Sequence, residues 1–381
     1  MSLPRSGLVA LVLPCLLAGG CGAPRSPAAA ADRGATASIP RTTRTATAPL
    51  TVPATATSPR VRSTPLPPRR VDAGRVFALL DPGETTTSAA RFAALSSVDG
   101  LVYRALWSRL ETAPGTYDWS TLDDIADVAR AARKPLTLHV APDLPGWLPG
   151  LGAQTYTYTS PLGSGTAVVP WDATYLARHG TFVKALAAHL RTRGDAGLVA
   201  MVSVGAPVAE MSLVGCRNGV LGSGPAYDRA QYLGAWKTSF AAHRDAFADS
   251  AFASVNLAIS APVSEICLPD GDGAAFHAEL MRHALSLTPR AAVFAADLNA
   301  LGSSRLAQVD AATRRDTMLH FQTIWSYSDD PANRFKGPLR DAVCSSWRAG
   351  ARYIEIYKAD LLNADPAVQA AIAAARDGTG C

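Results

Sequence analysis

The feature that most constrains the fold of this 381-residue chain is a regular alternation of strand-like and helix-like segments, which begins near residue 71. Eight short runs rich in aliphatic, β-branched and aromatic residues alternate with segments whose apolar positions recur at helical spacing. The expected strands are 75–80, 100–107, 136–140, 198–204, 253–259, 291–296, 318–325 and 351–357. Strands that alternate with helices form parallel sheets covered by helices, so the pattern predicts an α/β fold.

The number of strand–helix pairs distinguishes two architectures of this class. Eight pairs in about 310 residues are typical of a closed (β/α)8 TIM barrel. The alternative is an open, doubly wound sheet, whose nucleotide-binding form carries a glycine-rich turn after its first strand. Here that turn reads Asp81-Pro82-Gly83-Glu84. We therefore expect one TIM-barrel domain over residues 71–381.

The N-terminus has the features of a bacterial export signal. Arg5 precedes an apolar run at residues 8–17, which is too short to span a bilayer permanently. The following Ala18-Gly19-Gly20-Cys21 resembles a lipobox, in which Cys21 would carry the lipid. Acyl chains there would hold the protein at the membrane surface outside the cytoplasm. The alternative is ordinary signal-peptide cleavage nearby, which leaves Cys21 unmodified and the protein secreted. Either way, residues 1–21 form the signal peptide.

Residues 22–70 consist mainly of Ala, Thr, Pro, Ser and Arg, with very few large apolar side chains. Such a segment cannot offset the entropy cost of ordering by burying apolar surface. We therefore expect a disordered tether between the signal peptide and the barrel.

Composition limits the partners of the expected barrel. The chain is 48% hydrophobic, enough for a large core, and its net charge is +5. No cluster of Lys and Arg interleaved with aromatic residues occurs in the barrel region, so nucleic acid is not an expected partner. The cysteine spacing is not that of a zinc site, and no metal, cofactor or protein partner is inferred.

Four cysteines lie in the expected barrel. An even number in an exported chain indicates two disulfides. Their positions favour a bond between Cys216 and Cys267, which follow consecutive strands, and one between Cys344 and Cys381, which would fasten the C-terminus.

The stretch from residue 100 to residue 148 carries a recognisable order of residues. The pattern W-x-x-L-E-x-x-P-G-x-Y-x-W-x-x-L-D is formed by Trp107, Leu110, Glu111, Pro114, Gly115, Tyr117, Trp119, Leu122 and Asp123. This order, with Pro-Gly-Trp-Leu at 145–148, resembles (β/α)8-barrel glycoside hydrolases of the retaining clan that includes families 5 and 42. The resemblance implies a saccharide site at the carboxyl ends of the strands. The alternative for Tyr117 and Trp119 is that they pack this loop onto the barrel rim.

Glycoside hydrolysis requires two carboxyl groups, one to protonate the leaving oxygen and one ionised. The resemblance places the general acid/base after the fourth strand, where Glu210 stands, although Ala209 replaces the usual Asn before it. The clan's second carboxylate belongs at the end of the seventh strand, but this chain has Gln322 there. Glu355, inside the apolar eighth strand, is the predicted replacement, because a buried acid needs either a partner or a site.

Several alternatives remain for these carboxylates. Glu355 could instead form a buried ion pair with Arg104 or Arg352. Further candidate acids are Asp143, Asp297 and Asp329.

Aromatic and polar residues near the strand ends are predicted to bind the substrate, because aromatic faces stack on sugar rings and polar groups bond to hydroxyls. They are Arg104, Trp107, Trp147, Asn256, Asp297, Asn299, Gln322 and Trp325. His139 and His320 lie inside strands, and we interpret them as core histidines.

These observations predict an exported glycoside hydrolase that cleaves O-glycosidic bonds, with Glu210 as acid/base and Glu355 as nucleophile or base. The absence of a G-x-S-x-G motif argues against a serine hydrolase. The alternative, favoured by Gln322, is a barrel that has lost one carboxylate and binds saccharide without cleaving it, as a surface receptor or cell-wall adhesin.

Overall fold

The computed structural model describes residues 75–81, 83–141, 143–160, 163–205, 216–217, 220–260, 272–307, 309–351, 353–378 and 381. The predictions for the signal peptide, the tether, Cys21 and Glu210 lie outside these residues. The predicted Cys216–Cys267 bond also lies outside them, because Cys267 is not described.

Eight parallel strands form a closed barrel, as the sequence predicts. They are β1 (Arg75–Leu79), β2 (Gly100–Leu106), β5 (Leu136–Ala141), β8 (Val199–Val204), β11 (Asn256–Ser260), β12 (Ala291–Leu298), β13 (Met318–Thr323) and β14 (Tyr353–Tyr357). Each strand is hydrogen-bonded to the next in this order, and β14 is bonded back to β1. The protein is therefore a (β/α)8 TIM barrel.

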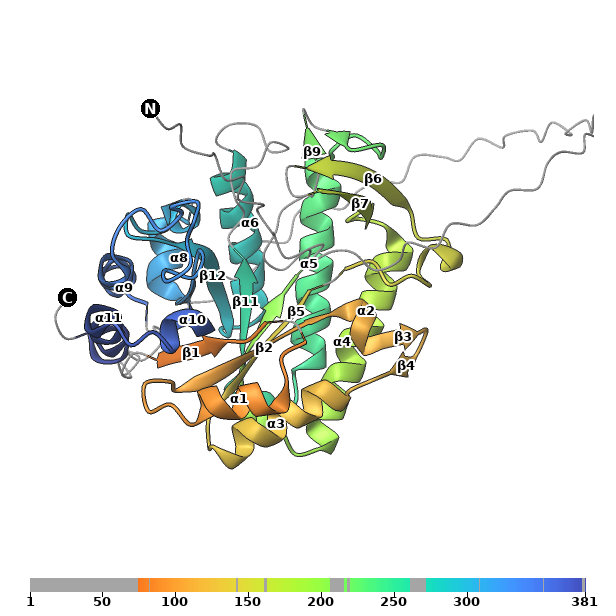
Figure 1. Ribbon diagram of the computed structural model, residues 1–381. Coiled ribbons are helices and arrows are strands. Elements are labelled where there is room, and N and C mark those ends of the chain that lie inside the picture. Colours follow the sequence, from red (N-terminus) through yellow and green to blue (C-terminus); the bar gives the residue numbers. More distant parts are fainter. Residues whose placement is uncertain are drawn as a thin grey trace, which may run out of the picture. The chain divides into compact units, whose positions relative to one another are not determined.

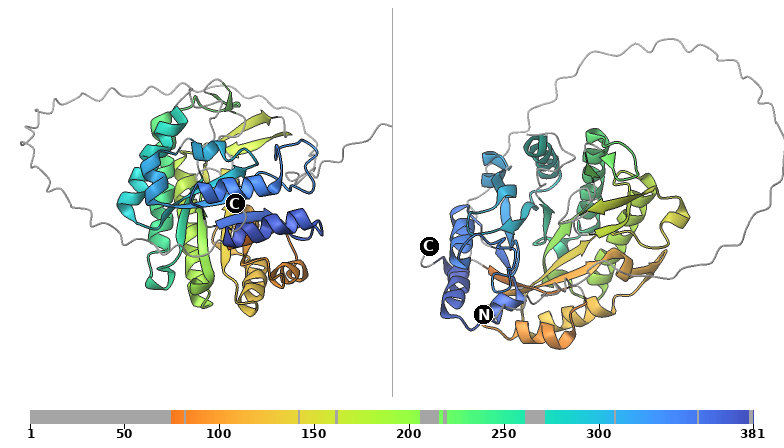
Figure 2. Two further views of the ribbon diagram at one scale, coloured as in Figure 1. Left: turned by 90° about the vertical axis from the view of Figure 1, so that its left-hand side faces the viewer. Right: turned by 45° about the horizontal axis from the view of Figure 1, so that its top comes forward.

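Helices surround the strands (Figures 1 and 2). The longer ones are α1 (Thr86–Ala93), α3 (Ser120–Ala131), α4 (Ala173–Thr192), α5 (Arg229–Ala246), α6 (Asp272–Leu287), α9 (Leu339–Arg348) and α11 (Pro366–Asp377). Shorter helices are α2 (Trp107–Leu110), α7 (Ser304–Ala307), α8 (Ala311–Asp316) and α10 (Lys358–Leu361). Several begin at an Asp cap: the Asp172 carboxylate, for example, accepts a hydrogen bond from the backbone N–H of Tyr175 at the start of α4. Within the described residues, no helix is both long and apolar enough to cross a bilayer.

The alternation of side chains along each strand produces two separate apolar regions. Outward-facing residues pack against the helices in a large core. Inward-facing residues fill the barrel itself, and they include Phe77 on β1, Val102 on β2, Phe294 on β12 and Tyr353 on β14. The barrel is thus a packed core, and polar residues inside it have to find partners there.

The fifth strand starts later than the sequence indicates. Residues 253–259 were the expected strand, but β11 covers Asn256–Ser260, because Phe252 and Val255 are buried in the turn before it. Asn256 therefore occupies the amino end of its strand. The seventh strand ends at Thr323, so Trp325 lies in the loop that follows.

Three hairpins extend from the carboxyl ends of neighbouring barrel strands. They are β3 (Glu111–Ala113) with β4 (Thr116–Tyr117), β6 (Thr155–Ser160) with β7 (Gly163–Val168), and β9 (Cys216–Arg217) with β10 (Val220–Leu221). They follow β2, β5 and β8 respectively, and β6, β7 and β9 lie together at the top of Figure 1. The segment at residues 155–168, rich in Tyr, Thr and Ser, thus forms a regular hairpin.

The C-terminal helix is fastened to the start of the barrel. The predicted bond between Cys344 on α9 and Cys381 is present, with the two Cα atoms 5.1 Å apart. On α11, Arg376 donates to Asp99 at 2.8 Å, and Asp99 in turn accepts from the backbone N–H of Val76 on β1.

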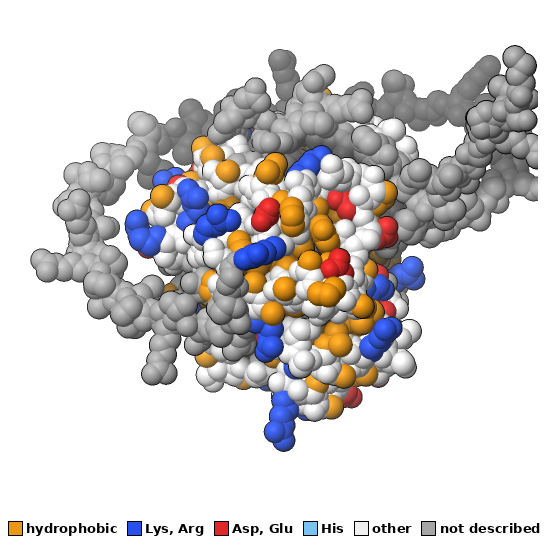
Figure 3. Space-filling model, turned by 60° about the vertical axis from the view of Figure 1, so that its left-hand side comes forward, with side chains coloured by type: hydrophobic (Ala, Val, Ile, Leu, Met, Phe, Trp, Pro, Cys, Tyr) orange, Lys and Arg blue, Asp and Glu red, His pale blue; other side chains and the backbone are white. Residues whose placement is uncertain are grey.

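On the face drawn in Figure 3, acidic and basic side chains are both present and are spread among apolar and neutral ones.

We predict that replacing both Cys344 and Cys381 by Ala lowers the free energy of unfolding by about 3 to 4 kcal/mol. The bond closes a loop between residues 37 positions apart, and its loss increases the entropy of the unfolded chain by about that amount. Urea unfolding under non-reducing conditions measures the difference. An unchanged midpoint would show that α11 is held by its noncovalent contacts alone.

A second prediction concerns histidines buried between helices. Burial lowers the pKa of His179 on α4 to about 3 and that of His243 on α5 to about 4, and the two rings lie 5.7 Å apart. Both are neutral when folded but titrate near pH 6.5 in the unfolded chain. These two histidines therefore do not reduce the free energy of unfolding above pH 6.5. As the pH decreases below 6.5, each of them reduces it by up to about 1.4 kcal/mol per pH unit.

Urea unfolding at several pH values between 7 and 5 tests this prediction. We expect His179→Phe, which fits among the surrounding aromatic rings, to reduce the slope, and Thr181→Ala, at an exposed threonine on the same helix, to leave it unchanged. Equal slopes for the wild type and His179→Phe would contradict the prediction.

Candidate functional site

The carboxyl half of the barrel interior contains a cluster of buried polar side chains. Glu355 on β14 has no exposed surface, and its Oε1 atom lies 2.7 Å from Nε2 of His139 on β5 and 2.7 Å from the hydroxyl of Tyr353. The Tyr353 oxygen lies 2.8 Å from Oγ1 of Thr137, which is also on β5. The cluster thus joins two strands, β14 and β5, that are three positions apart around the barrel.

The chemistry of the groups defines the direction of these hydrogen bonds. A phenol has one proton, and burial together with the neighbouring Glu355 carboxyl raises the pKa of Tyr353 well above 10, so this group keeps its proton. Tyr353 donates to Glu355, and the Thr137 hydroxyl donates to Tyr353. With Glu355 ionised, Nε2 of His139 also donates to it. Two donors therefore hold the same carboxylate oxygen.

The other carboxylate oxygen of Glu355 has no donor in the part of the chain that the structure describes. Oε2 of Glu355 and Oε1 of Gln322 are both buried, and neither has a hydrogen-bond partner among the residues that the structure describes. Gln322 on β13 is paired in register with Glu355, so the two side chains are neighbours on the inner face. A buried acceptor without a donor costs about 1–3 kcal/mol. Two of them side by side indicate a place for a ligand or water with hydrogen-bond donors.

Glu355 is thus paired with His139 and Tyr353. Arg104 on β2 is aligned in register with His139 and is partly exposed, and Arg352 lies outside the described residues. His139 is buried, as predicted for a core histidine, yet it also contacts the candidate site residue. His320 is likewise buried and lies against Tyr353.

Two partly exposed aromatic rings follow the strands that carry Gln322 and Glu355. Trp325 lies in the loop after β13, and its ring centroid is 5.9 Å from that of Tyr357 at the end of β14. The guanidinium of Arg334 lies over Trp325, 4.2 Å from the ring centroid. These positions agree with the predicted place of Trp325 at the rim.

The loop that contains Trp325 is held by a residue that the sequence analysis missed. Asp360 on α10 is completely buried, and its carboxylate accepts hydrogen bonds from the backbone N–H groups of Tyr327 and Ser328 and from the Ser326 hydroxyl. The sequence signal that could have indicated this residue is an acidic side chain in the segment directly after the eighth strand.

The prediction that Trp107 stacks on a sugar is wrong. Its indole is fully buried, packs against Trp147 and Phe182, and donates from Nε1 to Oε2 of Glu111 at 2.7 Å. A ring enclosed on both faces cannot contact a ligand. Trp107 therefore belongs to the core beneath the rim.

Glu111, from the same motif, explains this arrangement. It is fully buried, and its Oε1 accepts from the backbone N–H of Gly115 and from Arg178, both at 2.8 Å. Its backbone carbonyl accepts from Nε1 of Trp147 at 3.0 Å. Trp147 remains partly exposed, but the Arg178 guanidinium lies 5.3 Å from its ring centroid. The motif thus fastens the β3–β4 hairpin to the barrel.

Tyr117 and Trp119 also have a packing role. Their rings stack on each other with centroids 5.0 Å apart, and Trp119 stacks on His189 of α4 at the same distance. These contacts agree with the alternative interpretation, in which Tyr117 and Trp119 pack the loop onto the barrel rim.

The other polar residues that were predicted to bind substrate lie in two places, at the amino end of β11 and at the carboxyl end of β12. Asn256 is at the amino end of β11, opposite the carboxyl mouth, so its predicted contact with substrate there is wrong. Asp297 accepts from the hydroxyls of Ser303 and Ser304 and from the backbone N–H of Arg305. Asn299 accepts from the backbone N–H of Leu301 at 2.8 Å. The bonds of Asp297 and Asn299 shape the loop after β12.

Two further acids lie after barrel strands. Asp143, beyond β5, accepts from the backbone N–H and hydroxyl of Ser108, and burial raises the pKa of its carboxyl. Asp329 is exposed in the loop after β13. Among the described residues, no group of three His, Cys, Asp or Glu side chains is arranged to hold a metal ion.

Comparison with known proteins identifies the fold. No protein-family model and no curated protein matches the chain. Among solved structures, the catalytic domain of a beta-amylase from Paenibacillus polymyxa is similar over 78% of this chain and 95% of its own, with 11% identity and a TM-score of 0.56.

Two xylanases also match, with lower scores. Xylanase 10B from Thermotoga maritima covers 75% of this chain and 83% of its own, with 10% identity and a TM-score of 0.45. A psychrophilic family 10 endo-beta-1,4-xylanase covers 75% and 86%, with 11% identity and a TM-score of 0.41. At these identities, the similarity to the beta-amylase domain shows a shared barrel fold.

We predict that Glu111→Ala lowers the free energy of unfolding by about 2–3 kcal/mol, because it leaves the buried Nε1–H of Trp107 without an acceptor. Urea unfolding measures the loss. Glu279→Ala is the matched control, since this half-exposed acid pairs with Lys237 at the surface and contributes less than about 1 kcal/mol. Equal losses in the two variants would show that Glu111 does not hold the rim.

Proposed function

We propose that this barrel is an exported glycoside hydrolase that cleaves O-glycosidic bonds of a glycan or glycoside. The observation that carries the proposal is a pair of buried acceptors, Glu355 Oε2 and Gln322 Oε1, inside the carboxyl half of a TIM barrel, which have no donor among the described residues. A ligand rich in hydroxyl groups would supply the missing donors. The resemblance of the 107–123 motif to glycoside hydrolases and the shared fold with a beta-amylase support the same class.

The proposed mechanism assigns different work to the two carboxyl groups. Glu210, after β8, is the general acid that protonates the leaving oxygen. Glu355 is the ionised carboxylate that meets the positive charge developing at the anomeric carbon, as nucleophile or as base for a water molecule. His139 and Tyr353 orient Glu355 through its Oε1, and Gln322 bonds to a substrate hydroxyl. A separation of about 5 Å between the two carboxyls would accompany retention of configuration, and roughly 6.5–9.5 Å inversion.

Two observations favour a second candidate function, saccharide binding without hydrolysis. The seventh strand has Gln322 in place of a carboxylate, and Glu355 has no exposed surface, so a substrate reaches it only if the neighbouring side chains move. A surface receptor or cell-wall adhesin would need only the hydrogen bonds.

Export is part of the proposal. The Cys344–Cys381 bond supports an oxidising location, because stable disulfides are rare in the cytosol. Lipidation at Cys21 would then anchor the barrel to the outer side of the bacterial cell membrane through residues 22–70. If Cys21 is not lipidated, the protein is secreted.

The test is a screen of the purified protein against aryl glycosides of both anomeric configurations. We expect turnover in the wild type and a fall in kcat of about 10²–10⁴-fold in Glu355→Gln, because this change removes the charged group and keeps its size. Gln322→Ala should mainly raise KM. Glu279→Gln, at the surface of α6, is the control and should match the wild type.

The outcomes distinguish the two candidates. Binding of a saccharide without turnover would support the receptor or adhesin. Absence of both binding and turnover would contradict both functions, and undiminished activity in Glu355→Gln would remove this residue from the mechanism.

A further inference from the structure

A third buried polar atom without a described partner lies inside the barrel, on a strand that the proposed mechanism does not use. Ser260 is the last residue of β11 and is 7% exposed, and its hydroxyl has no hydrogen-bond partner among the residues that the structure describes. It shares this condition with Glu355 Oε2 and Gln322 Oε1. A buried hydroxyl without a partner costs free energy, so its presence requires an explanation.

The register of the strands places the Ser260 side chain on the inner face of the barrel. Ser260 is paired with Phe294 on β12, and paired residues of neighbouring strands point to the same side of a sheet. Phe294 belongs to the apolar cluster that fills the barrel, as does Ala258, two residues before Ser260. Ser260 therefore points toward the barrel axis, as Glu355 and Gln322 do.

The layers inside the barrel bring Ser260 close to the candidate site. Inward side chains of an eight-stranded barrel form layers of four, which come from alternate strands. Because the strands are tilted, paired residues step down by about one residue per strand from β11 to β14. Counting in this way places Ser260 in one layer with Gln322 and His139. The layer beneath contains Glu355 and Phe294, and His139 contacts both of them, at 2.7 Å from Glu355 and with ring centroids 4.9 Å apart from Phe294.

Solvent reaches the inner face of the barrel directly above Ser260. The next inward residue toward the mouth on the neighbouring strand β12 is Ala296, which packs against the interior cluster and yet is partly exposed. Alanine and serine have small side chains, so these two positions fill little of the interior on this side. A ligand group that enters over Ala296 therefore meets Ser260 on its way to Glu355.

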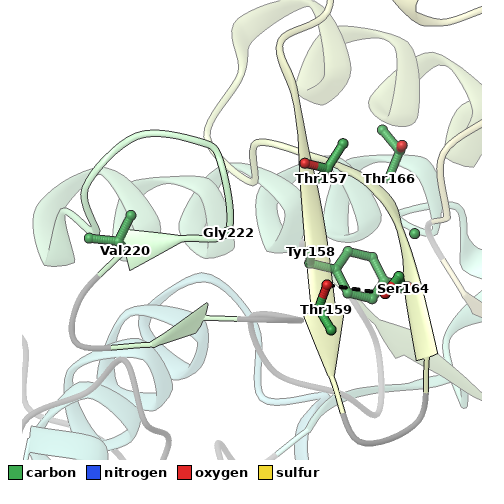
Figure 4. A pocket seen from close by; sticks show the side chains of 8 residues that line it. Thr157, Tyr158, Thr159, Ser164, Thr166, Val220 and Gly222 are labelled. Atoms are coloured by element: carbon green, nitrogen blue, oxygen red, sulfur yellow. Dashed lines mark hydrogen bonds between the residues drawn. The ribbon is translucent and has the colours of Figure 1, made fainter.

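The hydroxyl groups at the rim differ from that of Ser260. A cavity of about 700 Å³ lies between the β6–β7 and β9–β10 hairpins, and threonine and serine side chains line it (Figure 4). Three of these side chains already have partners in the protein: Ser164 donates to Thr159 at 3.1 Å, and the hydroxyls of Thr157 and Ser223 are 3.0 Å apart. The buried Ser260 has no such bond in the described chain, so its hydroxyl is the one that calls for a ligand.

We infer that Ser260 is a ligand-contacting residue of the site around Glu355, and that it selects saccharides with a hydroxyl group directed at β11. A serine hydroxyl both donates and accepts hydrogen bonds, so it complements Glu355 Oε2 and Gln322 Oε1, which only accept. An analogue that lacks the ligand hydroxyl leaves Ser260 without a partner and binds less well. That the ligand is a saccharide is taken from the proposed function, on which this assignment rests.

A cycle of two changes, one in the protein and one in the ligand, tests the contact. The probes are p-nitrophenyl glycosides of glucose, galactose, mannose and xylose in both anomeric forms, with the monodeoxy analogues of the best of them. For one analogue, we expect the wild type to lose about three- to tenfold in kcat/KM, or in affinity if the glycoside is bound without turnover. Ser260→Ala should show the same loss for the parent glycoside and no further loss for that analogue.

Stability distinguishes a ligand contact from a structural role. Ser260→Ala removes a buried hydroxyl without a described partner, so the midpoint of urea unfolding should stay the same or rise. Ser346→Ala on α9 is the matched control, because this buried hydroxyl donates to the carbonyl of Val343 at 2.7 Å. We expect the control to lower the midpoint and to leave kcat/KM for every glycoside unchanged.

Wild-type values of Ser260→Ala for the parent glycoside and all its analogues would overturn the contact and show that water alone satisfies this hydroxyl. A lower urea midpoint, with an equal loss for the parent and every analogue, would overturn it as well, because the role would then be structural. If the cycle behaves as expected but Glu355→Gln keeps full activity, the proposed role of Glu355 fails and the contact of Ser260 remains. If the wild type neither binds nor cleaves any of these glycosides, both fail.

Discussion

The candidate site depends on the hydrogen bonds between β14 and β1, which close the barrel. Closure brings the inner faces of all eight strands around one axis, so that Glu355 on β14 meets His139 on β5, although 216 residues separate them in the sequence. In an open sheet running from β1 to β14, these two strands would be five positions apart, with their side chains out of reach. The link from Arg376 through Asp99 to Val76 stabilises the first strand close to this closure. The polar cluster is therefore a consequence of the ring of strands.

The sequence predicted the fold well because strand and helix periodicities are local properties of the chain. The interior of the site depends on contacts between residues far apart in the sequence, and it was therefore harder to predict. An acid inside an apolar strand indicated correctly that Glu355 needs a partner or a site, but nothing local identified His139 as that partner. For Trp107, the motif located the residue near the rim without indicating which way its indole faces. The acid four positions later, Glu111, was the missed sign that this indole is buried and bonded. Asn256 was misplaced because the strand begins three residues after the expected start.

The hydrogen bonds of Glu355 divide its carboxylate into two parts with different roles. Oε1 receives Tyr353 and His139, and Thr137 orients Tyr353 in turn, so the position of the carboxyl is determined by three side chains on two strands. Oε2 is left for another donor. A carboxylate used only to stabilise the barrel would be expected to have both oxygens satisfied, because an unsatisfied buried acceptor is costly. The asymmetry is the feature that distinguishes Glu355 from Glu111, whose two oxygens both have donors.

The rim of the barrel is asymmetric. At β14 the strand passes directly into α10, and only residues 80–85 separate β1 from α1. After β5 and β8, by contrast, the chain makes additional hairpins before it returns to the barrel in α4 and α5. The β6–β7 and β9–β10 hairpins therefore extend one side of the rim, whereas the side next to Glu355 is formed by short connections.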